Sequence, residues 1–350
     1  MEPSETRKNK SPTATVSRRT FLKLLAAGVS GFFVARLFDL LATKTIETHT
    51  STVTATVTKT VTAATTVGPA SKSARVVMVR GAPNVGPQAL VDKALELLGG
   101  VEKLVPMGVS VLVKPNVGFY EKDAVTDPQV TAAVIRSLKR AKPARIVVGE
   151  SSVRGYDTEH ALRVTDMRGV AEEAGAELRD LRKDPAVNVG LPKGRAITSV
   201  DIFKTVHDSS YIVNIPRLKR HSATVTTICL KNMMGTLPDS EKGRFHQVDL
   251  SQCIADLNSV VRPNLVVIDA TRAMTRRGPT GGTMVDLNLV IASLDPVAAD
   301  TVAAEELFKA EGVSDPRGAV GRIEHIQRAA ELGIGVADSS KIEVLEVTLS

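Results

Sequence analysis

The chain has 350 residues, of which 43% are hydrophobic and 24% charged, a composition typical of a globular protein with one large or two moderate domains. Aromatic residues make up only 3% and tryptophan is absent, which argues against sugar-stacking or base-stacking surfaces. The formal charge of +7 is concentrated near the amino terminus, where residues 1–42 carry seven Lys or Arg and three acidic residues, so the remainder is mildly basic and no nucleic-acid role is expected.

The amino-terminal segment, residues 1–42, combines an arginine pair with a hydrophobic run. The stretch SRRTFLK, residues 17–23, precedes LLAAGVSGFFVA, twelve residues without a charge. This pattern resembles a twin-arginine export signal, which implies the twin-arginine translocase as a partner and a location outside the cytoplasmic membrane, secreted or membrane-anchored. An ordinary membrane anchor is the alternative, but a span needs about 20 apolar residues, and Arg36 and Asp39 interrupt this run. No clean cleavage site follows, so membrane contact through residues 21–42 stays open.

Residues 43–72 form a predicted linker. Twelve threonines lie between Thr43 and Val67, and the strict alternation over residues 51–62 is compatible with an edge strand. Threonine-rich low complexity directly after an export signal favours an extended stalk instead, of a kind that is often glycosylated. An α/β domain is therefore expected over residues 73–350.

From residue 73 onward, short β-branched runs alternate with helical patterns, which predicts an α/β fold with a mostly parallel sheet and helices on both faces. An insertion within this single domain is expected around residues 181–204. The predicted strands are 75–79, 110–113, 145–149, 211–215, 265–269 and 288–293. The predicted helices are 88–98, 128–141, 167–174, 247–261, 296–309 and 321–332.

Polar side chains follow five of the predicted strands. Ligands of open α/β sheets bind beyond the carboxyl ends of the strands, where helix N-termini also point free N–H groups, so these residues predict a polar site at one sheet edge. Taken singly, some have ordinary explanations: Asp295 before Pro296, for example, is typical of a helix cap. In chain order the residues are Lys114, Asn116, Glu150, Ser151, Lys219, Arg220, His221, Asp269, the segment 276–282, Asp295 and Asp300.

The polar residues fall into short motifs: Lys114-Pro-Asn116, Gly149-Glu-Ser151, Pro216-x-x-Lys-x-His221, Lys231-Asn232 with Gly235, His246, Asp269 followed by Gly278-Pro279-x-Gly281, and Asp295 with Asp300. Over residues 76–308 they resemble the domain-of-unknown-function family numbered 362, which implies a fold and candidate positions but no settled reaction. Several family members append ferredoxin-type cysteine runs. This chain has only Cys229 and Cys253, which either pair or stay buried thiols, so no iron-sulfur cluster is expected from one chain.

The spacing of His221 and Lys231 is similar to that of the nickel-pincer lactate racemase family. There a His is a metal ligand and a Lys ten residues later binds the cofactor. The resemblance implies a transition metal or metal-containing cofactor, with His221 as a metal ligand, and His246 is a second candidate ligand. A straight helix over residues 222–234 would separate His221 and Lys231 by roughly 15 Å along its axis. The β-branched run from Thr224 to Ile228 disfavours a helix, so a bend that brings the pair together is compatible with the sequence.

Two functional classes follow. In the first, the protein is an exported enzyme that moves protons on a small anionic substrate, with His221, Lys231, Glu150 and Asp269 as catalytic residues. In the second, it is a membrane-tethered binding protein for a small anion or metal complex, without catalysis. Both classes expect His221, Lys231, Lys114 and Asp269 to approach one cleft, and only the enzyme needs a titratable pair with separated pKa values there. The predicted substrate-binding residues are Lys114, Asn116, Ser151, Lys219, Asn232, Gly278 and Gly281, whereas His49, His160, His207 and His325 are expected at the surface.

Overall fold

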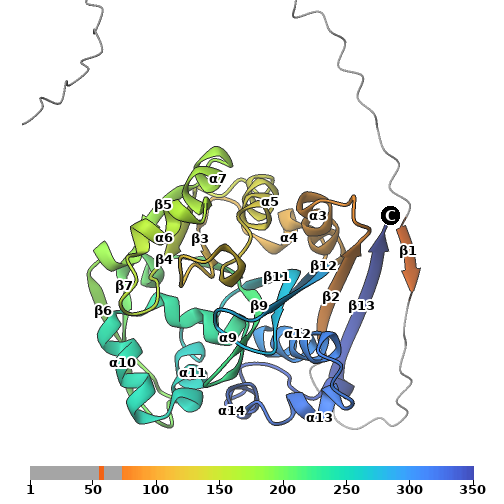
Figure 1. Ribbon diagram of the computed structural model, residues 1–350. Coiled ribbons are helices and arrows are strands. Elements are labelled where there is room, and N and C mark those ends of the chain that lie inside the picture. Colours follow the sequence, from red (N-terminus) through yellow and green to blue (C-terminus); the bar gives the residue numbers. More distant parts are fainter. Residues whose placement is uncertain (1–54, 59–72) are drawn as a thin grey trace, which may run out of the picture. The chain divides into compact units, whose positions relative to one another are not determined.

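The computed structural model describes residues 55–58 and 73–350, and their central feature is one large mixed β-sheet (Figure 1). Its strand order is β1-β13-β2-β12-β11-β8-β3-β4-β5, with β9 beside β11 and β10 beside β9, whereas β6 and β7 form a separate sheet. The strands are β1 (Ala55–Thr58), β2 (Ala74–Gly81), β3 (Ser110–Pro115), β4 (Arg145–Glu150), β5 (Glu177–Asp180), β6 (Ala186–Gly190), β7 (Ser199–Phe203), β8 (Tyr211–Ile215), β9 (Arg217–His221), β10 (Val225–Thr227), β11 (Leu265–Thr275), β12 (Thr283–Ser293) and β13 (Ile342–Leu349).

Helices cover both faces of the large sheet (Figure 1). One face carries α3 (Pro87–Leu97), α5 (Pro128–Lys139) and α7 (Met167–Glu173), and the other carries α11 (Leu250–Asn258), α12 (Pro296–Ala310) and α14 (Glu324–Glu331). The remaining helices are α4 (Val101–Leu104), α6 (Thr158–Val164), α8 (Lys204–His207), α9 (Cys229–Asn232), α10 (Asp239–Val248) and α13 (Pro316–Val320).

The central strands are apolar on both faces because each face has its own hydrophobic core. In β2, Val77 and Val79 belong to the core that α3 and α5 complete, whereas Val76 and Met78 belong to the core that α12 completes. An unbroken apolar run such as RVVMV is typical of a strand that is buried on both faces. The predicted α/β fold with a mostly parallel sheet and helices on both faces is confirmed.

Strand β12 runs against its neighbours. It pairs antiparallel with both β11 and β2, whereas β11, β8, β3, β4 and β5 are parallel to one another. It therefore ends at the opposite sheet edge from β3, β4 and β8, and the prediction that Asp295 joins the polar edge is wrong. Asp295 instead caps α12, where its carboxylate accepts hydrogen bonds from the N–H groups of Val297 and Ala298, both at 2.9 Å.

Two further predictions, one about a helix and one about the exposure of His325, differ from the structure. The helix expected over residues 247–261 is broken at Asp249, whose backbone is extended and whose carboxylate accepts the Gln252 N–H at 3.1 Å to cap α11. His325, expected at the surface, is fully buried, because α14 packs against α11 and α12. His207 is exposed, as predicted.

The predicted export signal, residues 1–42, lies outside the described residues, as does most of the predicted linker. Within the linker, Ala55–Thr58 pairs antiparallel with β13 at the sheet edge, so these four residues follow the edge-strand alternative. The predicted insertion contains the separate β6 and β7 pair. Among residues 55–58 and 73–350, none of the helices has the length and apolar character needed to cross a membrane.

Candidate functional site

A cavity of about 330 Å³ lies beyond the carboxyl ends of β3 and β4 and beside the β9–β10 hairpin. Its volume is at the lower end of the range for small-molecule sites. Much of the predicted site lines this cavity, with one face supplied by the end of β4 and another by the segment from β9 to α10. The predicted residues in the lining are Asn116, Glu150, Ser151, Lys219, His221, Lys231, Asn232 and His246.

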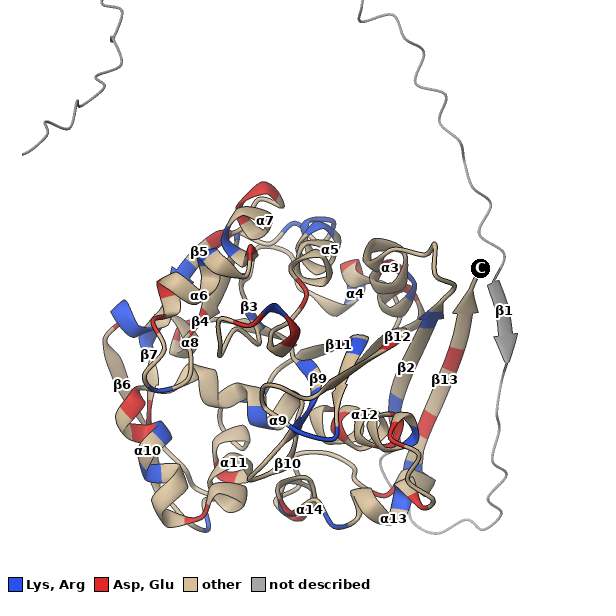
Figure 2. Ribbon diagram, in the orientation of Figure 1, with Lys and Arg blue, Asp and Glu red and all other residues tan. Residues whose placement is uncertain are grey.

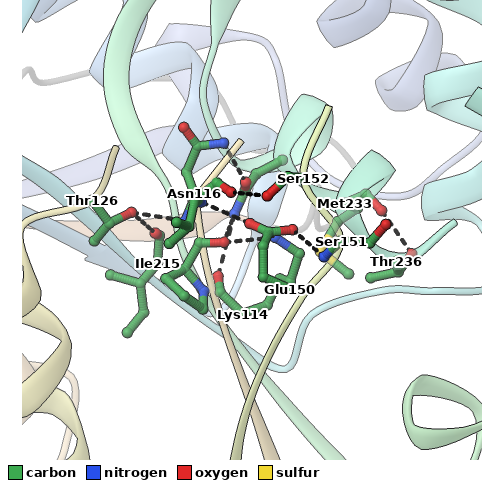
Figure 3. Close-up of polar contacts among 12 residues, drawn as sticks. Lys114, Asn116, Thr126, Glu150, Ser151, Ser152, Ile215, Met233 and Thr236 are labelled. Carbon is green, nitrogen blue, oxygen red and sulfur yellow. Dashed lines mark hydrogen bonds and ion pairs between the residues drawn. The ribbon is translucent and has the colours of Figure 1, made fainter. Parts of the chain in front are cut away.

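Glu150 organises the cavity wall and has no unused carboxylate oxygen (Figure 3). Its Oε2 accepts hydrogen bonds from Lys114 Nζ at 2.8 Å and the Val117 N–H at 2.7 Å, and its Oε1 accepts the Ser151 N–H at 2.8 Å. Lys114 is fully buried behind this carboxylate, and burial lowers its pKa while the Glu150 charge opposes that shift. The pair therefore ties the end of β3 to the end of β4, and Lys114 is not among the residues that line the cavity.

His221 ends β9 in a tight hairpin with β10. Its Nδ1 accepts hydrogen bonds from the N–H groups of Ala223 at 3.1 Å and Thr224 at 3.2 Å, so the ring proton of the neutral side chain lies on Nε2. Burial, followed by the charges of Lys231 and Lys219, lowers the pKa of His221 to about 3. At neutral pH His221 is thus an uncharged donor in the cavity wall.

Helix α9, which carries Lys231, is held at its N-terminus by a side chain of α12. The buried Asp300 carboxylate accepts hydrogen bonds from the N–H groups of Cys229 at 2.7 Å and Leu230 at 3.0 Å. Carboxylates are favoured at this position because the first N–H groups of a helix lack partners within it. The hairpin and this short helix replace the straight helix considered above, and they bring Lys231 to the cavity that His221 lines.

Asn116 and Asn232, both predicted to bind substrate, bond to each other. Asn116 Nδ2 donates to Asn232 Oδ1 at 2.9 Å, and Asn232 Nδ2 donates to Asn214 Oδ1 at 2.7 Å. The buried Oδ1 of Asn116 has no partner among the described residues. Asn232 therefore holds the α9 segment to the ends of β3 and β8, and Asn116 retains a buried acceptor without a partner among the described residues.

Lys219 is fully buried yet lines the cavity. Its Nζ donates to the Ala124 carbonyl and lies 5.0 Å from the centre of the Phe119 ring. Burial, together with the charges of Arg217 and Lys231, lowers its pKa to about 7. Its ammonium makes no ion pair within the described part of the chain.

Lys231 is half-buried and lines the cavity. Its Nζ contacts only the sulfur of Met234, at 3.2 Å, among the described residues. Burial and the charge of Lys242 lower its pKa to about 8. Lys231 in turn contributes to the lowered pKa values of Lys219, His221, His246 and His325.

Arg154 and Lys242 line the cavity but were not predicted. Lys242 Nζ donates to the Ser151 carbonyl at 2.9 Å, to the Ser151 hydroxyl at 2.6 Å and to the Ser152 carbonyl at 2.6 Å, which fixes the loop after β4. The Arg154 guanidinium lies over Gly243, where a β-carbon would stand 2.8 Å from Nη1. Gly243 lies in α10, a segment outside the predicted helices, so this close approach could not be anticipated from the sequence.

Positive charge in the cavity exceeds negative charge. Figure 2 marks basic residues on β9, α9 and α10, the elements that supply Lys219, Lys231 and Lys242. The carboxylate in the lining belongs to Glu150, and Lys114 already balances its charge. This arrangement suits an anionic ligand.

Four of the predicted catalytic and substrate-binding residues do not line the cavity: Lys114, described above, and Asp269, Gly278 and Gly281. Asp269 forms an ion pair with Arg217 and accepts the Asp127 N–H at 2.8 Å and the Thr271 hydroxyl at 2.6 Å, so its carboxylate is fully used within the fold. In the 276–282 loop, Pro279 reaches the cavity while Gly278 and Gly281 do not. Gly278 packs against the β9 backbone, where a β-carbon would lie 1.8 Å from the Arg220 carbonyl oxygen.

The side chains present do not fit a metal ion held by the protein alone. A histidine ligand of a metal normally donates its other ring N–H to an acceptor. In His221 the other nitrogen, Nδ1, is itself an acceptor, which leaves Nε2 protonated and without a lone pair for a metal. Within residues 55–58 and 73–350, no cluster of three or more His, Cys, Asp or Glu has metal-binding geometry.

A larger depression of about 1170 Å³ lies at the opposite sheet edge. Several of its charged lining groups are partnered within the fold, since Arg75 pairs with Glu343, Lys341 pairs with Asp338 and Asp295 caps α12. The smaller cavity, with its buried and unpaired cations, is therefore the candidate site.

Comparison with known proteins places the chain in a family. Residues 111–305 match the model described as Domain of unknown function (DUF362). A curated relative, the thylakoid-associated protein sll1697 of Synechocystis sp., is 29% identical over 230 residues, which cover 61% of this chain and 67% of the relative. A solved structure, the lactate racemase apoprotein from Thermoanaerobacterium thermosaccharolyticum, is similar with a TM-score of 0.41 and 11% identity, over 71% of this chain and 57% of that one. Because the family model spans more than half of the sequence and all of the cavity lining, this chain belongs to the DUF362 family.

Proposed function

We propose that the cavity binds a small anionic substrate and supports proton transfer on it, with Lys219 and Lys231 as the groups that exchange the proton. One observation carries the proposal: Lys219 and Lys231 both line the cavity, and neither ammonium group has a carboxylate partner among the described residues. The cavity is thus a site of unbalanced positive charge within the fold.

An anionic ligand follows from the cost of burying charge. A buried ammonium without an opposite charge destabilises the folded protein, because it has lost water and gained no counter-ion. A bound carboxylate or phosphate would supply that counter-ion to Lys219 and Lys231. Arg154 adds a guanidinium that has no hydrogen bond or ion pair in the described structure, and this group pairs readily with both oxygens of a carboxylate.

Proton transfer follows from the pKa values of the two lysines. A general acid or base is most effective when its pKa lies near the working pH. The pKa values of about 7 for Lys219 and about 8 for Lys231 let each side chain release and regain a proton near neutrality. His221, whose pKa is about 3, differs from them and acts as a neutral hydrogen-bond donor to the substrate.

Export by the twin-arginine route remains part of the proposal and is supported by the SRRTFLK motif. A tethered binding protein for the same anion is the second candidate, since Lys219, Lys231 and Arg154 satisfy the needs of binding alone. No step passes through a metal ion, since the donors of His221 do not fit one.

Calorimetry with malonate, pyruvate and inorganic phosphate tests binding, and NMR of pyruvate in D₂O tests proton exchange at its methyl carbon. We expect the wild-type protein to bind at least one of these anions and to catalyse exchange, and we expect Lys219→Met to lose exchange. Binding without exchange on pyruvate or on other small oxo and hydroxy acids would identify a binding protein. A failure to bind any of the three anions would contradict the proposed function.

A further inference from the structure

Four lysines surround the candidate site, and they differ in what their ammonium groups contact. Lys114 donates to Glu150 and to the Pro115 carbonyl, and Lys219 donates to the Ala124 carbonyl. Lys242 donates to three oxygens of the loop after β4. Lys231 has no oxygen acceptor in the described part of the chain and contacts only the Met234 sulfur.

The lack of an acceptor matters because a lysine becomes a nucleophile only as the neutral amine. Hydrogen bonds to oxygen and ion pairs favour the ammonium form, and Lys231 has neither. Burial and neighbouring cations favour the amine, as they do for lysines that react covalently with carbonyl groups. The lowered pKa of Lys231, about 8, agrees with surroundings that favour the neutral amine.

The backbone that carries Lys231 is also held rigidly, as a reactive side chain requires. On its amino-terminal side, Asp300 holds the N–H groups of Cys229 and Leu230, and Asn258 Nδ2 donates to the Leu230 carbonyl at 3.0 Å. On its carboxyl-terminal side, the Asn232 side chain is held by Asn116 and Asn214. These bonds hold the backbone on both sides of Lys231, a residue that lines the cavity.

We propose that Lys231 forms a Schiff base with the carbonyl carbon of a small oxo acid bound in the cavity. This inference rests on the proposed function, because the substrate's carboxylate would be the anion that Arg154 and Lys219 attract. It narrows the substrate to anions that carry an aldehyde or ketone group.

The step balances without an oxidant or reductant. The Lys231 lone pair forms the C–N bond while the C=O π pair moves to oxygen, and one proton passes from nitrogen to that oxygen to give a carbinolamine. The nitrogen lone pair then expels the hydroxyl group, which takes a proton from the Lys219 ammonium and leaves as water. The product is an iminium ion, whose positive charge eases removal of a proton from the adjacent carbon.

Reductive trapping on the purified full chain tests the inference. The protein is incubated with pyruvate or glyoxylate and sodium cyanoborohydride, and the adduct is located by peptide mass spectrometry. We expect one adduct per chain on Lys231, lost in Lys231→Met and in Lys231→Arg. Lys204→Met, which changes an exposed lysine paired with Asp208, serves as the matched control and should label like the wild type.

Parallel calorimetry separates the two levels of the proposal. Binding of pyruvate or glyoxylate without an adduct on Lys231, or an adduct spread over surface lysines, would overturn the Schiff base and leave the proposed function intact. If malonate or phosphate binds but pyruvate and glyoxylate neither bind nor form an adduct, the Schiff base would likewise be overturned and the proposed function left intact. No binding of any anion would overturn both, provided that circular dichroism shows a folded protein.

Discussion

Gly235 and Glu150 approach each other so closely that a β-carbon at position 235 would stand 2.2 Å from Glu150 Oε1. The same β-carbon would lie 2.7 Å from Lys114 Nζ, so the glycine leaves room for the buried ion pair behind the cavity. We therefore expect Gly235→Ala to separate Glu150 from Lys114. Breaking a buried pair costs about 3 kcal/mol or more, which a urea denaturation curve would detect.

Gly169 provides the control for this substitution. It lies in α7, and a β-carbon there would meet nothing within 4 Å. Gly169→Ala should be neutral or stabilise the protein by up to about 1 kcal/mol, because alanine is the better helix former. Equal effects at positions 169 and 235 would show that the close approach of Gly235 to the ion pair has no energetic consequence.

The stability of the protein without anion should depend on pH through Lys219. Its folded pKa of about 7 lies below the ordinary 10.5, so between these values the unfolded chain binds more protons and stability rises with pH. Lys219→Met removes this dependence. The variant should be more stable than the wild type by a few kcal/mol below pH 7, since each pKa unit is worth about 1.4 kcal/mol. Denaturation curves should show this difference shrinking as pH rises toward 10.5, and a constant difference would contradict it.

His325 should destabilise the folded protein. It is fully buried, burial lowers its pKa to about 3, and neither ring nitrogen has a partner among the described residues. Because unpaired buried polar groups cost about 1–3 kcal/mol, His325→Leu should raise the free energy of unfolding by about 1 kcal/mol. The exposed His207→Leu should change it little. Destabilisation by His325→Leu would reveal a buried water or other partner for the ring.

Export should depend on the arginine pair at positions 18 and 19. The charge of the segment is kept in the double variant Arg18→Lys and Arg19→Lys, while the motif is lost. We expect the variant to accumulate inside the cytoplasmic membrane and the wild type outside it, as measured by cell fractionation. Unchanged export of the variant would mean that residues 1–42 act as an ordinary signal or anchor.

The strands of this fold are predictable because the sheet is buried on both faces, which produces apolar runs such as residues 75–79 and 145–149. The antiparallel direction of β12 could not be predicted, because the spacing of the apolar runs is misleading. Its apolar end, residues 288–293, appears 18 residues after the predicted end of β11, room enough for a crossover. In the structure both strands continue into the polar stretch, and the seven residues 276–282 that remain between them permit only a hairpin.

The site is partly predictable for similar reasons. Lys219, His221 and Lys231 can be predicted because basic residues follow a buried strand. The β-branched run from Thr224 to Ile228 disfavours a helix, and the structure has the β9–β10 hairpin there. Asp269 looks equally functional in sequence, but its partner Arg217 is 52 positions away and becomes a neighbour only through the pairing of β9 and β11. Lys242 was not predicted because its helix, α10, is polar and lacks the regularly spaced apolar residues that indicate a helix in a sequence.

The central claim is that unpaired lysines at the cavity hold an anion. Calorimetric titration with malonate tests it most directly, because malonate carries charge but no ketone and so reports binding alone. We expect saturable binding by the wild type and the Lys204→Met control, and an affinity at least about tenfold weaker, or about 1.4 kcal/mol, in Lys231→Met. Absence of binding to the wild type, or equal affinity in all three proteins, would contradict the claim.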